Sequence, residues 1–319
     1  MSQYVESRGI LSHVSCQHQG DGSGLSCERS PLEHHRQSWL SIDGHLPSII
    51  RAYDPSRSRF EIRLTRRSNQ AFYEEVTTLL LSHLLTEFAP RTVFDIGAAG
   101  GYFAFVAASH IGAHPSVHCF EMKPHQVRLI EDKAKSAGLA QTVSAHLAGL
   151  SDRHVGRKRI WFVRNMMFES EPSPEAYREA WYIRLKFALR GGGGAYRKLQ
   201  PADVLLTSLD HFCATNGLSP DLIKINVDGY EGKVLAGAQA VLRESQPIVL
   251  LELHTNDMLR DGSTRRSVAA QLSDAGYRFL MITDHHRREA CDLVAFDASN
   301  PVLDRNEVDM ILCVPPRLA

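Results

Sequence analysis

A glycine-rich segment preceded by an acidic residue could bind a nucleotide-like ligand. The apolar run ending in Asp95 and Ile96 continues into Gly97, Ala98, Ala99, Gly100 and Gly101. Glycines in a turn between a buried strand and a helix let the backbone approach a ligand closely, because no Cβ intervenes. Their spacing does not match the Gly-x-Gly-x-x-Gly pattern of dinucleotide sites, and Asp95 would repel a pyrophosphate. A carboxylate here suits a cationic ligand, and S-adenosylmethionine carries a sulfonium and an ammonium group.

A second acid stands at a matching place on the next predicted strand. Glu121 follows Asp95 by 26 residues, a plausible strand–helix–strand distance. A carboxylate at such a strand end can accept hydrogen bonds from both hydroxyls of a ribose. Each signal alone is also consistent with a tight turn and a surface glutamate. Together they predict a site for the adenosyl cofactor S-adenosylmethionine, with six binding residues: Asp95, Gly97, Ala98, Gly100, Gly101 and Glu121.

Polar residues also follow two later apolar runs. Asp228 and Glu231 come after one run, and Glu252 and His254 end the next. Ligands of open α/β sheets bind beyond the carboxyl ends of the strands, so these side chains are the catalytic candidates. S-adenosylmethionine is a methyl donor, and transfer of its methyl group to an alcohol requires a general base or a metal. We predict His254 as the base, because imidazole titrates near neutrality, with Asp228 orienting a hydroxyl and Glu231 beside them.

Two other interpretations of these residues stay open. Asp228, Glu231 and Glu252 could hold a divalent cation through hard oxygen ligands, although we predict no metal site. In a purely structural interpretation, Glu231 caps the helix after Gly229, and Glu252 and His254 form a fixed polar pair.

Regular alternation of strands and helices must position these residues. From residue 91 onward, strand-sized apolar runs are separated by segments with helical spacing. Such a pattern predicts a mostly parallel seven-stranded α/β sheet with helices on both faces. The predicted strands are Thr92–Ile96, Ser116–Phe120, Val143–Leu147, Leu222–Val227, Ile248–Leu253, Tyr277–Ile282 and Val308–Val314.

The remaining segments divide the chain further. Residues 1–35 are rich in Ser, Gly, Gln and His, and they predict a flexible tail. Residues 36–90 predict an extension made of a strand at 59–64 and a helix from Ser68 to Phe88. The third unit is residues 91–319, interrupted at about 153–206 by an insertion with an aromatic helix at 174–189. Its aromatic and methionine content predicts a lid, for which Gly191–Gly194 could be a hinge.

Composition excludes several other classes. The 319 residues contain 36 Lys and Arg against 36 Asp and Glu, so the formal net charge is zero and a nucleic-acid partner is not expected. No apolar run approaches the roughly 18–20 residues that span a bilayer, so no membrane association is expected. Six cysteines without a metal or disulfide pattern indicate a reducing, cytoplasmic location.

The order of these motifs resembles a known family. From Thr92 to Val314 the chain is similar to the FkbM-type S-adenosylmethionine-dependent methyltransferases. The resemblance implies a class I methyltransferase (Rossmann-like) fold and, usually, O-methylation of sugar or polyketide hydroxyls on a small acceptor. The matching segments are Phe94–Phe103, Phe120–Pro124, Leu209–Asp210, Asp221–Glu231, Val234–Leu235, Gly237–Ala238 and Leu250–His254.

The sequence departs from the family at two positions. Asn226 and Asp228 stand where Asp and Glu are usual, and an asparagine can neither act as a base nor supply charge to a metal. Three alternatives to a small-molecule O-methyltransferase remain. They are an RNA or other nucleic-acid methyltransferase using the arginines at 57–67 and 153–164, a non-catalytic adenosyl-binding module, and a dehydrogenase. The glycine spacing disfavours the last of these.

Overall fold

The computed structural model describes residues 16–18, 25–27, 74–110, 115–163, 166–173, 201–282 and 291–318. The predicted strand at 59–64, the start of the following helix at Ser68, the helix at 174–189 and the glycine run at 191–194 lie outside these residues. Among the described residues, no helix is both long and apolar enough to cross a bilayer.

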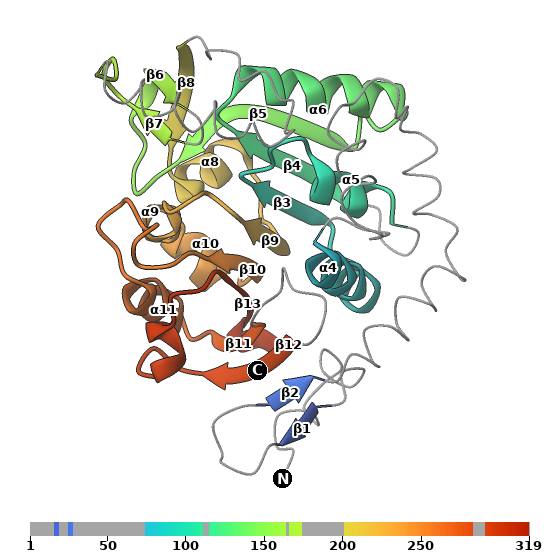
Figure 1. The fold of residues 1–319 in the computed structure, drawn as a ribbon. Helices are drawn as coiled ribbons and strands as arrows, with labels where there is room; N and C mark the ends of the chain where they lie inside the picture. The colour runs from blue at the N-terminus through green and yellow to red at the C-terminus, as the bar shows by residue number, and fades with distance from the viewer. Residues whose placement is uncertain are drawn as a thin grey trace, which may run out of the picture.

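A sheet of seven strands forms the centre of the molecule (Figure 1). Five neighbouring strands are parallel, β13 is antiparallel to β10, and β11 is antiparallel to β13. In spatial order, the seven strands are β5 (Val143–Leu150), β4 (Ser116–Glu121), β3 (Thr92–Ile96), β9 (Leu222–Ile225), β10 (Ile248–Leu253), β13 (Asp309–Val314) and β11 (Arg278–Ile282). The predicted mostly parallel α/β sheet is therefore confirmed.

Helices cover both faces of this sheet, as predicted (Figure 1). On one face lie α4 (Glu75–Phe88), α5 (Tyr102–Ala108) and α6 (Pro124–Ser136), which share one apolar cluster with the strands. The other face carries α8 (Leu209–Asn216), α9 (Glu231–Ala236), α10 (Gln239–Glu244) and α11 (Arg265–Asp274), which share a second cluster.

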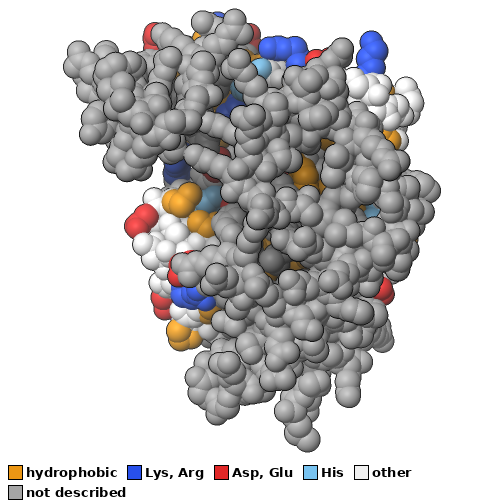
Figure 2. All heavy atoms as spheres, turned by 45° about the vertical axis from the view of Figure 1, so that its right-hand side comes forward, with side chains coloured by type: hydrophobic (Ala, Val, Ile, Leu, Met, Phe, Trp, Pro, Cys, Tyr) orange, Lys and Arg blue, Asp and Glu red, His pale blue; other side chains and the backbone are white. Residues whose placement is uncertain are grey.

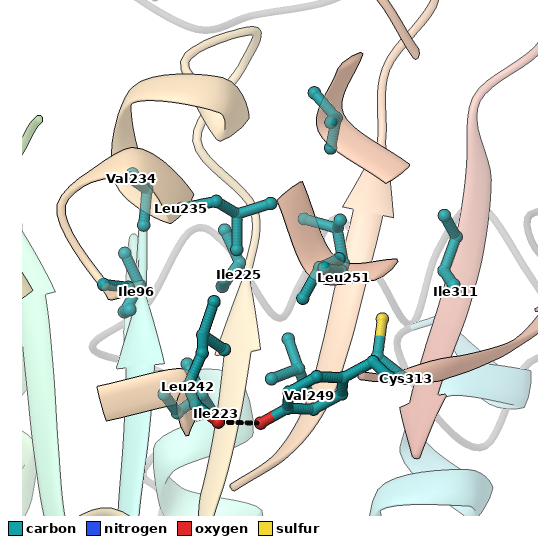
Figure 3. Packing of buried hydrophobic residues seen from close by; sticks show 14 of the residues in the cluster. Ile96, Ile223, Ile225, Val234, Leu235, Leu242, Val249, Leu251, Ile311 and Cys313 are labelled. Atoms are coloured by element: carbon teal, nitrogen blue, oxygen red, sulfur yellow. Dashed lines mark hydrogen bonds between the residues drawn. The ribbon is translucent and has the colours of Figure 1, made fainter. Parts of the chain in front are cut away.

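The second cluster holds the central strands under α9 and α10. Ile225, Leu235 and Leu251 are each no more than 1% exposed, and Figure 3 shows them pointing toward one another. Burying an aliphatic side chain of this size contributes about 1.5–3 kcal/mol. Because β10 is buried along its whole length, the polar residues at its end have a rigid support.

One predicted boundary was wrong near the carboxyl end of a central strand. The chain after that strand forms two short helices, α9 and α10, which are separated at Gly237, where a Cβ would lie 2.0 Å from the carbonyl oxygen of Ser151. The fourth strand, β9, ends at Ile225 rather than Val227, because the chain turns into a left-handed conformation at Asp228 (φ 52°).

Further strands extend the sheet to thirteen among the described residues. At one edge, β8 (Ala202–Thr207) is parallel to β5 and pairs antiparallel with β6 (Gly156–Val163), which pairs with β7 (Met166–Phe168). The described part of the insertion therefore continues the sheet. At the other edge, β11 pairs with β12 (Cys291–Phe296), followed by β2 (Leu25–Cys27) and β1 (Cys16–His18). These last two strands lie within the predicted tail, whose boundary stays a prediction.

Candidate active site

The glycine turn after β3 is fixed against two neighbouring strand ends. Gly97 has φ +77°, and a Cβ on it would lie 1.7 Å from the carbonyl oxygen of Asn226. The amides of Gly97 and Ala98 donate to the carbonyl of Phe120, at 3.0 and 3.1 Å. Glycine tolerates both this φ and this approach, so its presence lets the turn lie against the ends of β4 and β9.

Glu121, at the end of β4, holds the same turn from the other side. Its Oε2 accepts a hydrogen bond from the amide of Ala99 at 2.9 Å, and its Oε1 accepts one from the amide of Lys123 at 2.8 Å. A carboxylate has about four acceptor sites, so two remain for a ligand. The glycine turn and this acid are thus in contact, and their predicted role in binding the cofactor stays a prediction.

A cavity of about 420 Å³ opens at these strand ends. Gly97, Ala99 and Glu121 line it together with Asn226 and Asp228, which follow β9. The lining does not include Ala98, Gly100 or Gly101, which belong to the turn itself. Its other side is mainly apolar and combines residues of β5 and the residue after β4 with side chains of β6, β7 and β8: Met122, Ala148, Leu150, Ile160, Met167, Phe168 and Leu206. The cavity thus has a polar and an apolar side, and its size is that of a small-molecule site.

Asp95 is on the opposite side of β3 from this cavity. Successive side chains of a strand point to opposite faces, and here Ile96 lines the cavity while Asp95 does not. The Asp95 carboxylate is 2% exposed and lies 3.8 Å from Nζ of Lys224 on β9. Burial raises the pKa of Asp95, and the Lys224 ammonium and the Ala104 amide oppose this rise. The nearest charge to Asp95 is thus Lys224, and its predicted contact with a cofactor stays a prediction.

Glu252 on β10 belongs to the same buried polar region. Asn226 donates a hydrogen bond from Nδ2 to Oε2 of Glu252, so the asparagine connects this acid to the cavity wall. Burial raises the pKa of Glu252 to about 7, with repulsion from Glu74 adding to the rise and Lys224 and His254 opposing it. At neutral pH this carboxyl group is therefore poised between its two charge states.

The three predicted catalytic residues come together around one imidazole. Nδ1 of His254 lies 2.6 Å from Oε1 of Glu231, and both side chains are buried. Nε2 lies 3.8 Å from Oδ1 of Asp228 and 3.8 Å from Oε1 of Glu252. Burial lowers the pKa of His254, but the hydrogen bond and charge of Glu231, with the charges of Glu252 and Asp228, outweigh it and raise that pKa above 6.5.

Of these three residues, Asp228 alone lines the cavity, and a strained turn brings it there. Its φ is 52°, an uncommon left-handed value for a residue with a Cβ. Gly229 follows with φ +99°, and a Cβ on it would lie 2.0 Å from the carbonyl oxygen of Met258. Strain of this kind costs about 1–3 kcal/mol and is concentrated at functional sites.

Sequence reasoning missed several residues of this region. Lys224 interrupts the apolar run Ile223–Ile225, and a buried charge needs a partner, so its position was a usable signal. Gly149 has no comparable signal, although a Cβ on it would meet Sδ of Met122 at 2.7 Å. The apolar side chains of β6 and β7 that line the cavity could not be assigned to it without the sheet pairing.

The strand order, with five parallel strands, one antiparallel insertion and a glycine turn facing Glu121, defines a class I (Rossmann-like) methyltransferase. The sequence model of the Methyltransferase FkbM domain matches residues 95–279, which is more than half of the chain. The chain therefore belongs to the FkbM methyltransferase family.

Solved structures with a related fold are distant in sequence. Methyltransferase FkbM from Methylobacillus flagellatus KT is 13% identical with a TM-score of 0.38, and the match covers 81% of this chain but only 61% of that one. Cofactor-bound Rv0187 from MTB is 13% identical with a TM-score of 0.44, and the match covers 90% and 97% of the two chains. An O-methyltransferase from Bacillus cereus in complex with SAH is 10% identical with a TM-score of 0.40, covering 83% and 97%. No curated protein matches the sequence.

The cofactor of this enzyme is S-adenosylmethionine, and the chemistry of the described residues fits it. The cavity has the Glu121 carboxylate at one strand end and an apolar side toward β5 and β6. Among the described residues, the polar region beside it contains the acids Glu74, Asp95, Asp228, Glu231 and Glu252 with the cations Lys224 and His254, and the cavity lining adds Glu121 and Glu169 with Lys123 and Lys233. A ligand with a sulfonium and an ammonium group would compensate this excess of carboxylates.

Proposed function

We propose that this methyltransferase transfers a methyl group to a hydroxyl of a small sugar-containing or polyketide-like acceptor. Membership in the FkbM family and the small-molecule size of the cavity support this proposal. The observation that carries it is the position of Asp228, which lines the cavity and lies 3.8 Å from the buried imidazole of His254.

Residues of the glycine turn and of β4 would hold the cofactor. Glu121 has acceptor sites left for ribose hydroxyls, and Gly97, which packs against the Asn226 carbonyl, lines the cavity beside it. The apolar side chains of Met122, Met167 and Phe168 suit a flat purine ring. When bound, S-adenosylmethionine supplies a methyl group on a sulfonium, which leaves as a neutral thioether.

Removal of the hydroxyl proton would fall to Asp228 and His254. Since His254 does not line the cavity and Asp228 does, we place the acceptor hydroxyl against the Asp228 carboxylate. The O–H bond breaks as the new O–CH₃ bond forms, and the proton passes through Asp228 to Nε2 of His254. The present 3.8 Å separation is longer than a hydrogen bond, as is common for catalytic pairs before substrate binds. Glu231, bonded to Nδ1, fixes the tautomer and stabilises the imidazolium.

This assignment gives the reaction a pH dependence of known sign. His254 accepts a proton only in its neutral form, and its carboxylate neighbours raise its pKa above 6.5. Turnover should therefore be low in acid and increase as pH passes that raised pKa.

The test is an acceptor screen with methyl-labelled S-adenosylmethionine, followed by mass spectrometry of the product. We expect the label on an oxygen, and a label only on nitrogen or sulfur would contradict the proposal. With the best acceptor, His254→Gln should reduce kcat by about 10²–10⁴-fold and remove the rise with pH. His211→Gln, an exposed histidine on α8, is the control and should leave the profile unchanged. Full turnover of His254→Gln across the pH range would remove His254 as the base.

A further inference from the structure

Arg265, the first residue of α11, is a fully buried arginine, with 0% of its surface exposed. The helix start that carries it is fixed by a capping box, in which Thr264 and Ser267 exchange hydrogen bonds. The backbone amide of Arg265 also donates to Oδ1 of Asn256 at 2.9 Å. These local hydrogen bonds fix the backbone of Arg265 independently of the contacts that its guanidinium makes.

The guanidinium donates to five different groups. Nη2 bonds Oδ2 of the buried Asp309 at 2.6 Å, and Nε bonds the carbonyl of Leu303 at 3.1 Å. Nη1 points at three carbonyls, those of Glu307 at 2.6 Å, Leu253 at 3.2 Å and His254 at 3.4 Å.

Two of these acceptors are the carbonyls of the last residue of β10 and of His254 itself. The ladder between β10 and β13 ends at the pair Leu253 and Asp309, so the sheet provides no further partner for the His254 carbonyl. Leaving such a buried carbonyl unsatisfied would destabilise the folded chain. Arg265 satisfies it and so fixes the backbone from which the imidazole projects.

We propose that Arg265 is a positioning residue that holds His254 against Glu231 and Asp228. The catalytic part of this inference rests on the proposed function, and the positioning part does not. The Nδ1 to Oε1 distance of 2.6 Å between His254 and Glu231 is short, and a small backbone shift at the end of β10 would lengthen it.

The segment between His254 and Arg265 connects the same two parts of the site. The amide of Arg260 donates to the carbonyl of Gly229 at 2.8 Å, and the amide of Lys233 donates to Oδ2 of Asp261 at 2.8 Å. The turn that carries Asp228 is thus bonded to the loop that Arg265 terminates. Because Arg265 ends the loop and also bonds the His254 carbonyl at its start, the loop holds His254 and Asp228 in a fixed relative position.

The substitution Arg265→Lys tests this inference, because lysine keeps the charge but cannot reach five acceptors in one plane. The readout is the pKa of the His254 imidazole, measured by an NMR titration of histidine-labelled protein. The His254 signal is identified as the one that is lost in His254→Gln. We expect that pKa to fall by about half a pH unit or more toward 6.5, since the raising effect depends on contact with Glu231. Arg266→Lys is the matched control, because Arg266 is the next residue and bonds the exposed Asp304 instead.

Turnover supplies the second readout. Arg265→Lys should lower kcat about tenfold or more with little change in the KM for the cofactor, because a catalytic group is misplaced while the cofactor cavity is intact. A folded Arg265→Lys protein with an unchanged His254 pKa would overturn the inference. If the variant does not fold, Asp309→Asn replaces it, and an unchanged His254 pKa there would overturn the inference equally. If Arg265→Lys shifts the His254 pKa but the His254→Gln enzyme stays active, Arg265 keeps its positioning role and His254 is rejected as the base.

Discussion

Glu252 is the residue at which the structure makes its sharpest thermodynamic prediction. Its side chain is 95% buried, lies among other acids, and accepts a hydrogen bond from Asn226. The substitution Glu252→Gln removes the ionisable group but keeps an acceptor oxygen for Asn226. We expect the variant to be more stable than the natural protein at alkaline pH and about equally stable in acid.

The magnitude follows from the pKa of this carboxyl group, which burial raises from its usual 4.5 to about 7. Each pH unit corresponds to about 1.4 kcal/mol, so ionised Glu252 costs the folded state about 3 kcal/mol. Below pH 4.5 the carboxyl is protonated in both the folded and the unfolded chain, and the cost is absent. Between 4.5 and about 7 the unfolded chain ionises first, so the stability of the natural protein falls with increasing pH. Above 7 the full cost applies.

Urea unfolding followed by circular dichroism at pH 5 and pH 8 measures this effect. The stability difference between Glu252→Gln and the natural protein should widen by about 2.5 kcal/mol from the lower to the higher pH. Glu131→Gln, on the exposed side of α6, is the control and should show a flat difference. If the stability difference between Glu252→Gln and the natural protein is the same at both pH values, the raised pKa of the buried Glu252 carboxyl is refuted. A gain in stability joined to a loss of turnover would indicate a functional role for the charge.

Two further predictions concern the cofactor side of the cavity. Glu121→Gln should weaken S-adenosylmethionine binding in calorimetry by about 10–100-fold, because a hydrogen bond to a charged group contributes about 1.5–3 kcal/mol, and an unchanged Kd would remove Glu121 from the site. Gly97→Ala should lose at least about 2 kcal/mol of unfolding free energy, because its Cβ would lie 1.7 Å from a carbonyl oxygen at φ +77°. Gly100→Ala, whose Cβ would find its nearest neighbour at 3.8 Å, is the matched control, and equal losses in the two variants would contradict this account of the turn.

The sequence by itself determined the central elements and the ends at which polar residues gather. The strands β3 and β10 have the predicted bounds, because short apolar runs between helical segments form the buried strands of a sheet covered on both faces. The glycine turn and Glu121 were predicted to bind one ligand, which stays a prediction; they lie in contact because parallel strands present their carboxyl ends at one edge.

The tertiary structure decided on which side of the sheet each polar side chain lies and what it contacts. Asp95 and Ile96 are neighbours in sequence, yet only Ile96 faces the cavity, because the side chains of a strand alternate. The five contacts of Arg265 join segments up to 44 residues apart, and no local pattern encodes such a meeting. The pKa values of Glu252 and His254 likewise depend on burial and on charges from other strands, which exist only once the chain has folded.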